Sequence, residues 1–146
     1  MKIDKTTFAQ YKIRNSSSWT MLIFGILALL LGLLGIAKPE ILLRILGFET
    51  VERTARASHD YTLVYIMASC MASFNMGIYY ILAALNNLKK FYFWTVPFRG
   101  VTFVVFTASV IMGYTPSKFL GVALWELVGG IVTGIALYYE HKRGTA

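Results

Sequence analysis

Four long apolar runs dominate the chain, and shorter polar segments separate them. The runs cover about residues 19–37, 61–85, 92–114 and 119–139 of the 146 residues. Each approaches or exceeds the ~20 residues that a helix needs to cross ~30 Å of hydrocarbon. None shows the period-2 alternation of a membrane β-strand. The pattern predicts an all-α integral membrane protein: a four-transmembrane-helix bundle in a single domain, residues 1–146.

A short helix is expected between the first two runs. Lys38-Pro39-Glu40 suits a helix start, because proline fits the first turn and an acidic side chain complements the positive end of the helix dipole. The apolar residues that follow share one face: Ile41, Leu42, Ile45 and Leu46. We therefore expect a short helix in the outer membrane interface. The first run exceeds a usual signal-peptide core, so we expect it to be retained as a span.

The polar stretch that follows, residues 50–60, is expected to be helical as well. In a helix, residues four apart lie on the same face, and oppositely charged side chains at that spacing can pair. Glu49 and Arg53 have this spacing, and so do Glu52 and Arg56. The sequence therefore predicts a second polar helix, with two internal ion pairs, leading into the second span.

Composition agrees with a membrane protein. The chain is 57% hydrophobic and 14% charged, whereas soluble domains have about 45–50% and about 25%. Its net charge of +7 comes mainly from basic residues beside the apolar runs, where they set orientation and attract anionic lipid. We do not expect nucleic-acid binding, because the chain has no basic stripe and no soluble domain.

Basic residues also predict the orientation. Eight lie in the N-terminal tail, the second connection and the C-terminal tail: Lys2, Lys5, Lys12, Arg14, Lys89, Lys90, Lys142 and Arg143. Five lie on the opposite side: Lys38, Arg44, Arg53, Arg56 and Lys118. The larger number marks the cytoplasmic side. We expect both termini to be cytoplasmic and the protein to lie in a bacterial inner (plasma) membrane.

Small residues are placed to bring the spans together. Glycine lets helix backbones approach closely in lipid. Gly25 and Gly32 lie in the first span, and Gly77 lies in the second. In the fourth span Gly130 and Gly134 continue the helix face that begins at Glu126. This face is expected to pack against protein, which turns Glu126 inward.

Only two charged side chains lie deep in the apolar runs, Arg99 and Glu126. A charge in hydrocarbon costs about 2.5–3.5 kcal/mol on insertion scales, so it usually faces protein and has a partner. Depth estimates separate the two backbones by about 10 Å. A direct ion pair then requires both side chains to extend, and a bridging water or hydroxyl is an equal alternative. Arg99 has a further alternative, which is to reach the inner headgroups.

Candidate ligand-binding residues follow from these depths. Asn75 lies near the level of Arg99, and Cys70 and Ser69 lie near the level of Glu126. With Arg99 and Glu126 they form the candidate set. One cysteine and two distant histidines give no metal-site spacing, and no nucleotide or nucleophile motif is present, so neither a metal nor a cofactor is expected.

The layout resembles the DoxX-like families of small four-helix bacterial membrane proteins. The features are Lys38-Pro39-Glu40 after the first span, Asn75 and Gly77 in the second, Arg99-Gly100 in the third and Glu126 in the fourth. This resemblance implies architecture more than activity. A more distant likeness is to emopamil-binding-type proteins, which hold sterol-like ligands and use buried acidic residues. A second deep acidic residue is missing here, which disfavours their isomerase chemistry.

The leading hypothesis is a non-enzymatic membrane protein that binds membrane lipid or a small hydrophobic molecule, or serves as an accessory subunit. A homo-oligomer or a larger membrane complex is compatible with it. One alternative is a membrane enzyme that uses Glu126 as acid or base on a lipid-soluble substrate. A pocket that opens sideways and reaches Glu126 would favour this enzyme. Another alternative is a small transporter or channel subunit.

Overall fold

The computed structural model describes residue 13 and residues 15–144. Four of the predicted basic residues, Lys2, Lys5, Lys12 and Arg14, lie outside this part of the chain. The described elements are α1 (Ser16–Ala37), α2 (Pro39–Ile45), η2 (Arg53–Ala55), α3 (Thr62–Leu85), α4 (Lys89–Ile111), η3 (Ser117–Phe119) and α5 (Leu120–Lys142), and they include no strand. The all-helical prediction is confirmed for these residues.

Four of these helices, α1, α3, α4 and α5, are long and apolar enough to cross a membrane. Their bounds differ from the apolar runs by a few residues. α4 begins at Lys89 instead of residue 92, because Lys89 and Lys90 extend the helix beyond its apolar part. It ends at Ile111 instead of residue 114, and Gly113 follows with a φ of +75°. Glycine adopts this left-handed conformation without steric cost, so it suits a helix end.

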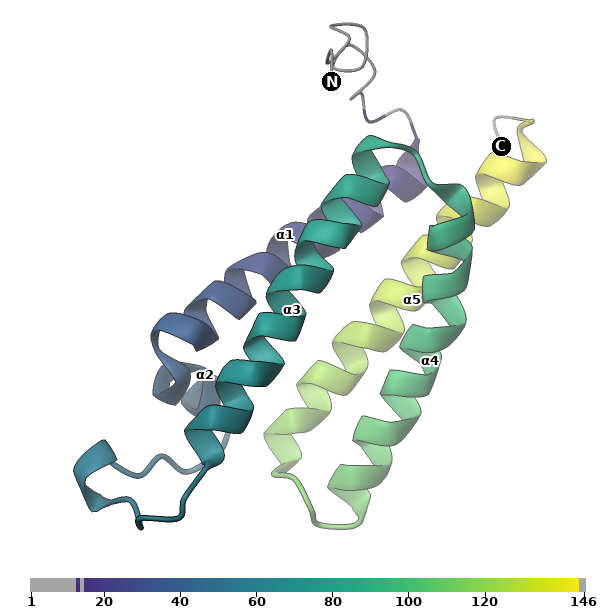
Figure 1. Ribbon diagram of the computed structural model, residues 1–146. Coiled ribbons are helices and arrows are strands. Elements are labelled where there is room, and N and C mark those ends of the chain that lie inside the picture. Colours follow the sequence, from purple (N-terminus) through teal and green to yellow (C-terminus); the bar gives the residue numbers. More distant parts are fainter. Residues whose placement is uncertain (1–12, 14, 145–146) are drawn as a thin grey trace, which may run out of the picture.

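The long helices form two antiparallel pairs. α1 packs against α3, α4 packs against α5, and the two pairs meet mainly through α1 and α5 (Figure 1). The start of α1 and the end of α5 lie at the same end of the bundle, which we call the terminal end (Figure 1). α3 and α4 are joined by a tight turn at that end and diverge away from it (Figure 1). This divergence leaves part of the α4 surface facing α3 without close packing.

Glycines allow α1 and α3 to approach closely. A Cβ atom at Gly32 would lie 2.8 Å from the Cys70 carbonyl oxygen, and one at Gly77 would lie 2.6 Å from the Leu29 amide nitrogen. Both distances are too short for a side chain. At the same contact the Ser73 hydroxyl donates to the Ala28 carbonyl oxygen at 3.1 Å. Gly25 also faces Gly77, so the predicted packing glycines of these two spans lie at one helix contact.

The connection between α2 and α3 differs from its prediction. Residues 50–60 form only the single turn η2, so the expected polar helix is wrong. Arg53 pairs with Glu40 of α2, not with Glu49. Arg56 pairs with Asp60 at 2.7 Å, not with Glu52. One pair therefore ties the connection to α2 and the other lies within the connection, just before α3, and neither supports a helix of its own.

Asp60 also starts α3. Its Oδ1 accepts a hydrogen bond from the Thr62 amide at 2.9 Å, and the Thr62 hydroxyl donates to the same oxygen. These hydrogen bonds, together with Arg56, hold the pKa of Asp60 below its ordinary value. The ion pair with Arg53 likewise lowers the pKa of Glu40.

α2 lies at the opposite end from the termini (Figure 1). Leu43 is buried against the bundle, whereas Ile41 and Ile45 of the predicted apolar face are 44% and 59% exposed. Two large aliphatic side chains thus face away from the protein.

A buried polar cluster closes the terminal end, and we call it the terminal junction. It consists of Asn15, Ser17, Ser18, Asn87, Lys89, Tyr92 and Glu140. Glu140 accepts hydrogen bonds from the Ser17 amide at 2.7 Å and the Ser17 hydroxyl at 2.9 Å, and it pairs with Lys89 at 3.4 Å. The carboxylate thereby satisfies an amide in the first turn of α1, where the helix dipole favours negative charge.

The rest of the terminal junction holds the turn between α3 and α4. Asn87 has a φ of +52°, a conformation that asparagine tolerates better than most residues. Its side-chain oxygen accepts hydrogen bonds from Asn15 at 3.0 Å and from the Ser18 hydroxyl at 3.1 Å. The Tyr92 hydroxyl donates to the Ala83 carbonyl oxygen at 2.8 Å. The start of α1, this turn and the end of α5 are therefore fixed together.

Candidate functional site

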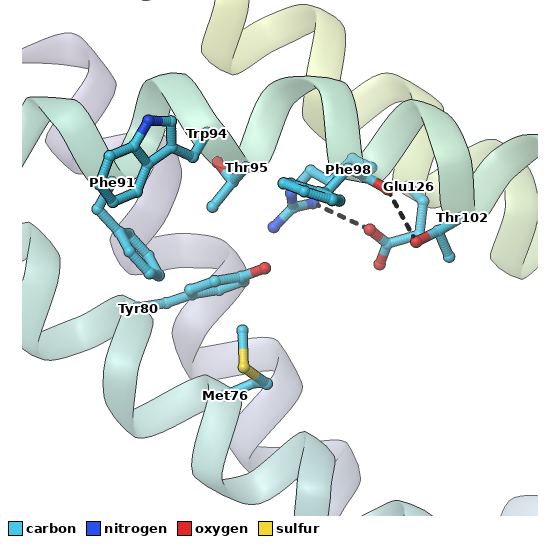
Figure 2. A pocket seen from close by; sticks show the side chains of 9 residues that line it. Met76, Tyr80, Phe91, Trp94, Thr95, Phe98, Thr102 and Glu126 are labelled. Atoms are coloured by element: carbon cyan, nitrogen blue, oxygen red, sulfur yellow. Dashed lines mark hydrogen bonds and ion pairs between the residues drawn. The ribbon is translucent and has the colours of Figure 1, made fainter.

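One face of α4 lines a pocket between α3 and α4. Its residues recur at the spacing of a single helix face: Phe91, Trp94, Thr95, Phe98, Arg99 and Thr102. Met76 and Tyr80 of α3 form the opposite wall, and Glu126 of α5 completes the lining (Figure 2). The pocket has a volume of about 270 Å³. Four of its nine lining residues are aromatic, and its two charged residues are the two identified as deep charges.

Arg99 lies where all four long helices meet. It is the eleventh residue of α4, near the middle of the helix, and it is only 4% exposed. Its guanidinium carbon lies 4.2 Å from the ring centre of Phe24 on α1 and 5.3 Å from that of Tyr80 on α3. A guanidinium within about 6 Å of an aromatic ring is attracted by the electrons of the ring face. Two rings therefore compensate part of the cost of burying this charge.

The Arg99 guanidinium has unused hydrogen-bond donors. Its Nε and Nη1 are buried, and neither has a hydrogen-bond partner among the described residues. Its Nη1 lies 3.6 Å from Glu126 Oε2, which is an ion pair without a hydrogen bond. Arginine carries five donors, so a buried guanidinium with this arrangement is under-satisfied. The guanidinium therefore has capacity for an additional oxygen acceptor, which would have to displace the side chains that cover these two atoms.

Arg99 and Glu126 form a direct ion pair, which was one of the alternatives that the sequence left open. The backbone offset itself is present: the Cβ of Arg99 lies opposite Gly130, one helical turn from Glu126. The long arginine side chain crosses that turn along α5. The depth estimate concerned the backbones alone, and the length of the arginine side chain decides in favour of the direct pair. The alternative in which Arg99 extends to the headgroups is also wrong for this structure, because the guanidinium points to Phe24 and Glu126.

Gly129 makes room for this arrangement. A Cβ atom there would collide with Arg99 Nη1 and would lie 2.6 Å from Cζ of Phe24. Gly130 is less restrictive, since its Cβ would lie 3.4 Å from the Cβ of Arg99. At Gly134 the nearest atom, on Val96, would lie at an ordinary contact distance of 3.5 Å. The sequence reasoning selected Gly130 and Gly134 and missed the glycine that is in contact with the charge.

The other candidate residues lie outside the pocket. Cys70 is buried between α1 and α3, where it faces Gly35. Ser69 is exposed on α3, and Asn75 is half-buried on the same helix. Only Arg99 and Glu126 of the five candidates come together at the pocket. No group of three or more His, Cys, Asp or Glu side chains suited to a metal ion occurs within the described part of the chain.

Besides Gly129, three contributors to the site were not anticipated. Phe24 and Tyr80 come from other helices, and nothing local in their sequence marks them as neighbours of Arg99. The aromatic wall on α4 could have been found, because Phe91, Trp94 and Phe98 continue the helix face of Arg99 toward the N-terminus. The arrangement offers flat apolar walls, one buried ion pair and unused N–H donors beside them. It can hold an apolar molecule that carries a polar group.

Comparisons with protein-family models, with curated proteins and with solved structures found no match to this chain.

Proposed function

We propose that this chain is an integral membrane protein that binds a lipid-soluble molecule in the pocket between α3 and α4. The observation that carries the proposal is Arg99, a buried guanidinium with unused donors in the wall of an aromatic pocket. A buried donor without a partner costs about 1–3 kcal/mol, more when it is charged. A ligand with a polar group would recover part of that cost.

The proposal places the four long helices across the membrane, with the terminal end in the cytoplasm and α2 in the opposite interface. Support for this orientation comes from the excess of basic residues in the two tails and the second connection of the sequence and from the exposed Ile41 and Ile45 of α2. Arg99 then lies near mid-membrane. The pocket lies between two spans, so a ligand would enter sideways from the lipid. The resemblance to DoxX-like proteins stays a prediction.

The membrane-enzyme alternative retains one supporting observation, which is that the pocket reaches Glu126. An acid or base must lie within reach of the proton that it transfers, and an accessible carboxylate meets that geometric requirement. Binding alone needs fewer assumptions, because it needs no second reacting group. The two functions differ in outcome: an enzyme would release a chemically altered molecule, whereas a binding protein would return the same one.

Native mass spectrometry of the detergent-extracted protein, with identification of bound molecules, tests the proposal. We expect a defined species on the wild-type protein and its loss in Arg99→Met. Arg44→Met is the matched control, because it removes an exposed guanidinium on α2. Phe98→Ala is a second pocket variant, and it keeps Arg99 in place. Phe98 is 70% exposed, so its removal should disturb the packing of the bundle little. If all four proteins carry the same lipids in the proportions of the membrane, the proposal fails.

A further inference from the structure

We infer that the occupant of this pocket is an uncharged, ring-bearing molecule that presents a carbonyl or hydroxyl oxygen to Arg99. This inference rests on the proposed function and specifies the chemical class of its ligand. It follows from three features of the pocket: its charge balance, its unused donors and the shape of its walls.

The charge balance favours an uncharged head. Arg99 Nη1 and Glu126 Oε2 lie 3.6 Å apart, so the two opposite charges give the pocket no net charge. The Glu126 side chain is 26% exposed and lines the pocket, so an anionic head placed beside Arg99 would also meet this carboxylate. A cationic head placed beside Glu126 would meet the guanidinium. In a site of low dielectric either repulsion is strong, and a neutral dipole avoids both.

The unused donors favour an oxygen acceptor. Arg99 Nε and Nη1 lack hydrogen-bond partners among the described residues, and the guanidinium has no acceptor capacity of its own. A plain hydrocarbon would leave these donors unmet, whereas a carbonyl oxygen can accept from the guanidinium. A hydroxyl can also accept there, and it can donate to Glu126. The pocket should therefore bind a molecule with such an oxygen more tightly than an apolar molecule of similar shape that lacks it.

The walls favour a flat ring. Tyr80 and Phe91 meet edge to face, with ring centres 5.8 Å apart, and Trp94 and Phe98 extend the aromatic surface along α4. Aromatic rings pack well against such surfaces in offset or edge-to-face geometry. The volume of about 270 Å³ is small beside the roughly 300–1,000 Å³ of sites that enclose drug-sized ligands. The pocket thus suits a ring and its oxygen, with an apolar tail left between α3 and α4.

Three probes that differ only in the head test the inference: para-dodecylacetophenone, para-dodecylbenzoate and dodecylbenzene. Binding to the full chain in phosphatidylcholine nanodiscs is measured by native mass spectrometry. We expect the ketone to bind at least about tenfold more tightly than either of the others. Equal binding of all three, or strongest binding of the benzoate, would overturn the inference and leave the proposed function intact. If no probe binds and no molecule co-purifies, the proposed function itself fails.

Glu126→Gln provides a second, directional test. The substitution keeps the shape of the side chain and removes its negative charge, so the pocket gains the uncompensated charge of Arg99. We expect the ratio of benzoate to ketone affinity to rise at least about tenfold. Glu52→Gln, on the exposed connection, is the control and should leave the ratio unchanged. An unchanged ratio in a folded Glu126→Gln protein contradicts the inference, and the wild-type probe series decides the question if this variant does not fold.

Discussion

The bundle contains two acidic residues with basic partners in or near its interior, and their surroundings differ. Glu140 in the terminal junction is 7% exposed, and its contacts with described residues include hydrogen bonds from Ser17 at 2.7 and 2.9 Å and an ion pair with Lys89. Glu126 has one ion pair at 3.6 Å and lines a pocket. A fully partnered buried carboxylate fixes structure, whereas a loosely partnered pair beside a cavity keeps capacity for a ligand.

The sharpest way to break this comparison is to make the same substitution at both carboxylates. Glu140→Gln should lower the free energy of unfolding in detergent by about 2–3 kcal/mol, because it weakens two charge-assisted hydrogen bonds and an interaction with the start of α1. Glu126→Gln should lower it less, because among the described residues the carboxylate accepts no hydrogen bond and forms only a 3.6 Å ion pair, while the rings of Phe24 and Tyr80 still face the guanidinium. Titration with sodium dodecyl sulfate measures both. Equal losses at the two sites would contradict the assigned roles.

A smaller loss is expected from a methyl group placed against the buried arginine. Gly129→Ala should cost about 2 kcal/mol, because the new Cβ would collide with the guanidinium and crowd Phe24. The same titration applies, and the variant should also lose its co-purified molecule. Gly121→Ala on the same helix is the control, since no atom lies within 4 Å of its Cβ position. It should be neutral or slightly stabilising, because alanine favours helix. Similar results for both variants would show that Arg99 is not held as described.

The smallest effect is expected at the exposed connection and depends on pH. The folded-state pKa of Asp60 is lowered by its hydrogen bonds to Thr62 and by Arg56. Its contribution to stability is therefore present at neutral pH and is lost as the pH falls through the lowered folded-state pKa. We expect faster proteolysis of residues 50–60 by an acid-active protease at the lowest pH. Asp60→Asn should weaken this pH dependence and leave the part that comes from the Arg53–Glu40 pair, whose carboxylate pKa is also lowered. An unchanged dependence would exclude Asp60 as a source.

The sequence was informative about features that are local in the chain. Runs of apolar residues predicted four long helices, and Pro39 and Glu40 predicted the start of α2, because hydrophobicity and helix-start preferences act over a few neighbouring residues. Residues 50–60 were mispredicted because the prediction used only the local spacing of their charges. Their charges have helical spacing, but Arg53 finds its partner in Glu40 and Arg56 finds its partner in Asp60.

Contacts between distant segments were not readable in this way. Ser17 and Glu140 are 123 residues apart, and no local pattern connects them. At the candidate site the two charges could be named from the sequence, but their contact depends on the length of the arginine side chain and on the space that Gly129 leaves. Phe24 and Tyr80 became neighbours of Arg99 only through the packing of α1 and α3 against the other pair.

The central claim is that the pocket between α3 and α4 selects a molecule from the membrane. Phe98 and Phe93 test it most directly, because both lie on α4 and are 70% and 68% exposed, but only Phe98 lines the pocket. A photoreactive benzoylphenylalanine is placed at each position in turn, and the cross-linked molecules are identified by mass spectrometry. We predict one dominant species at position 98 and a mixture with the composition of the membrane at position 93. The same mixture at both positions would contradict the claim.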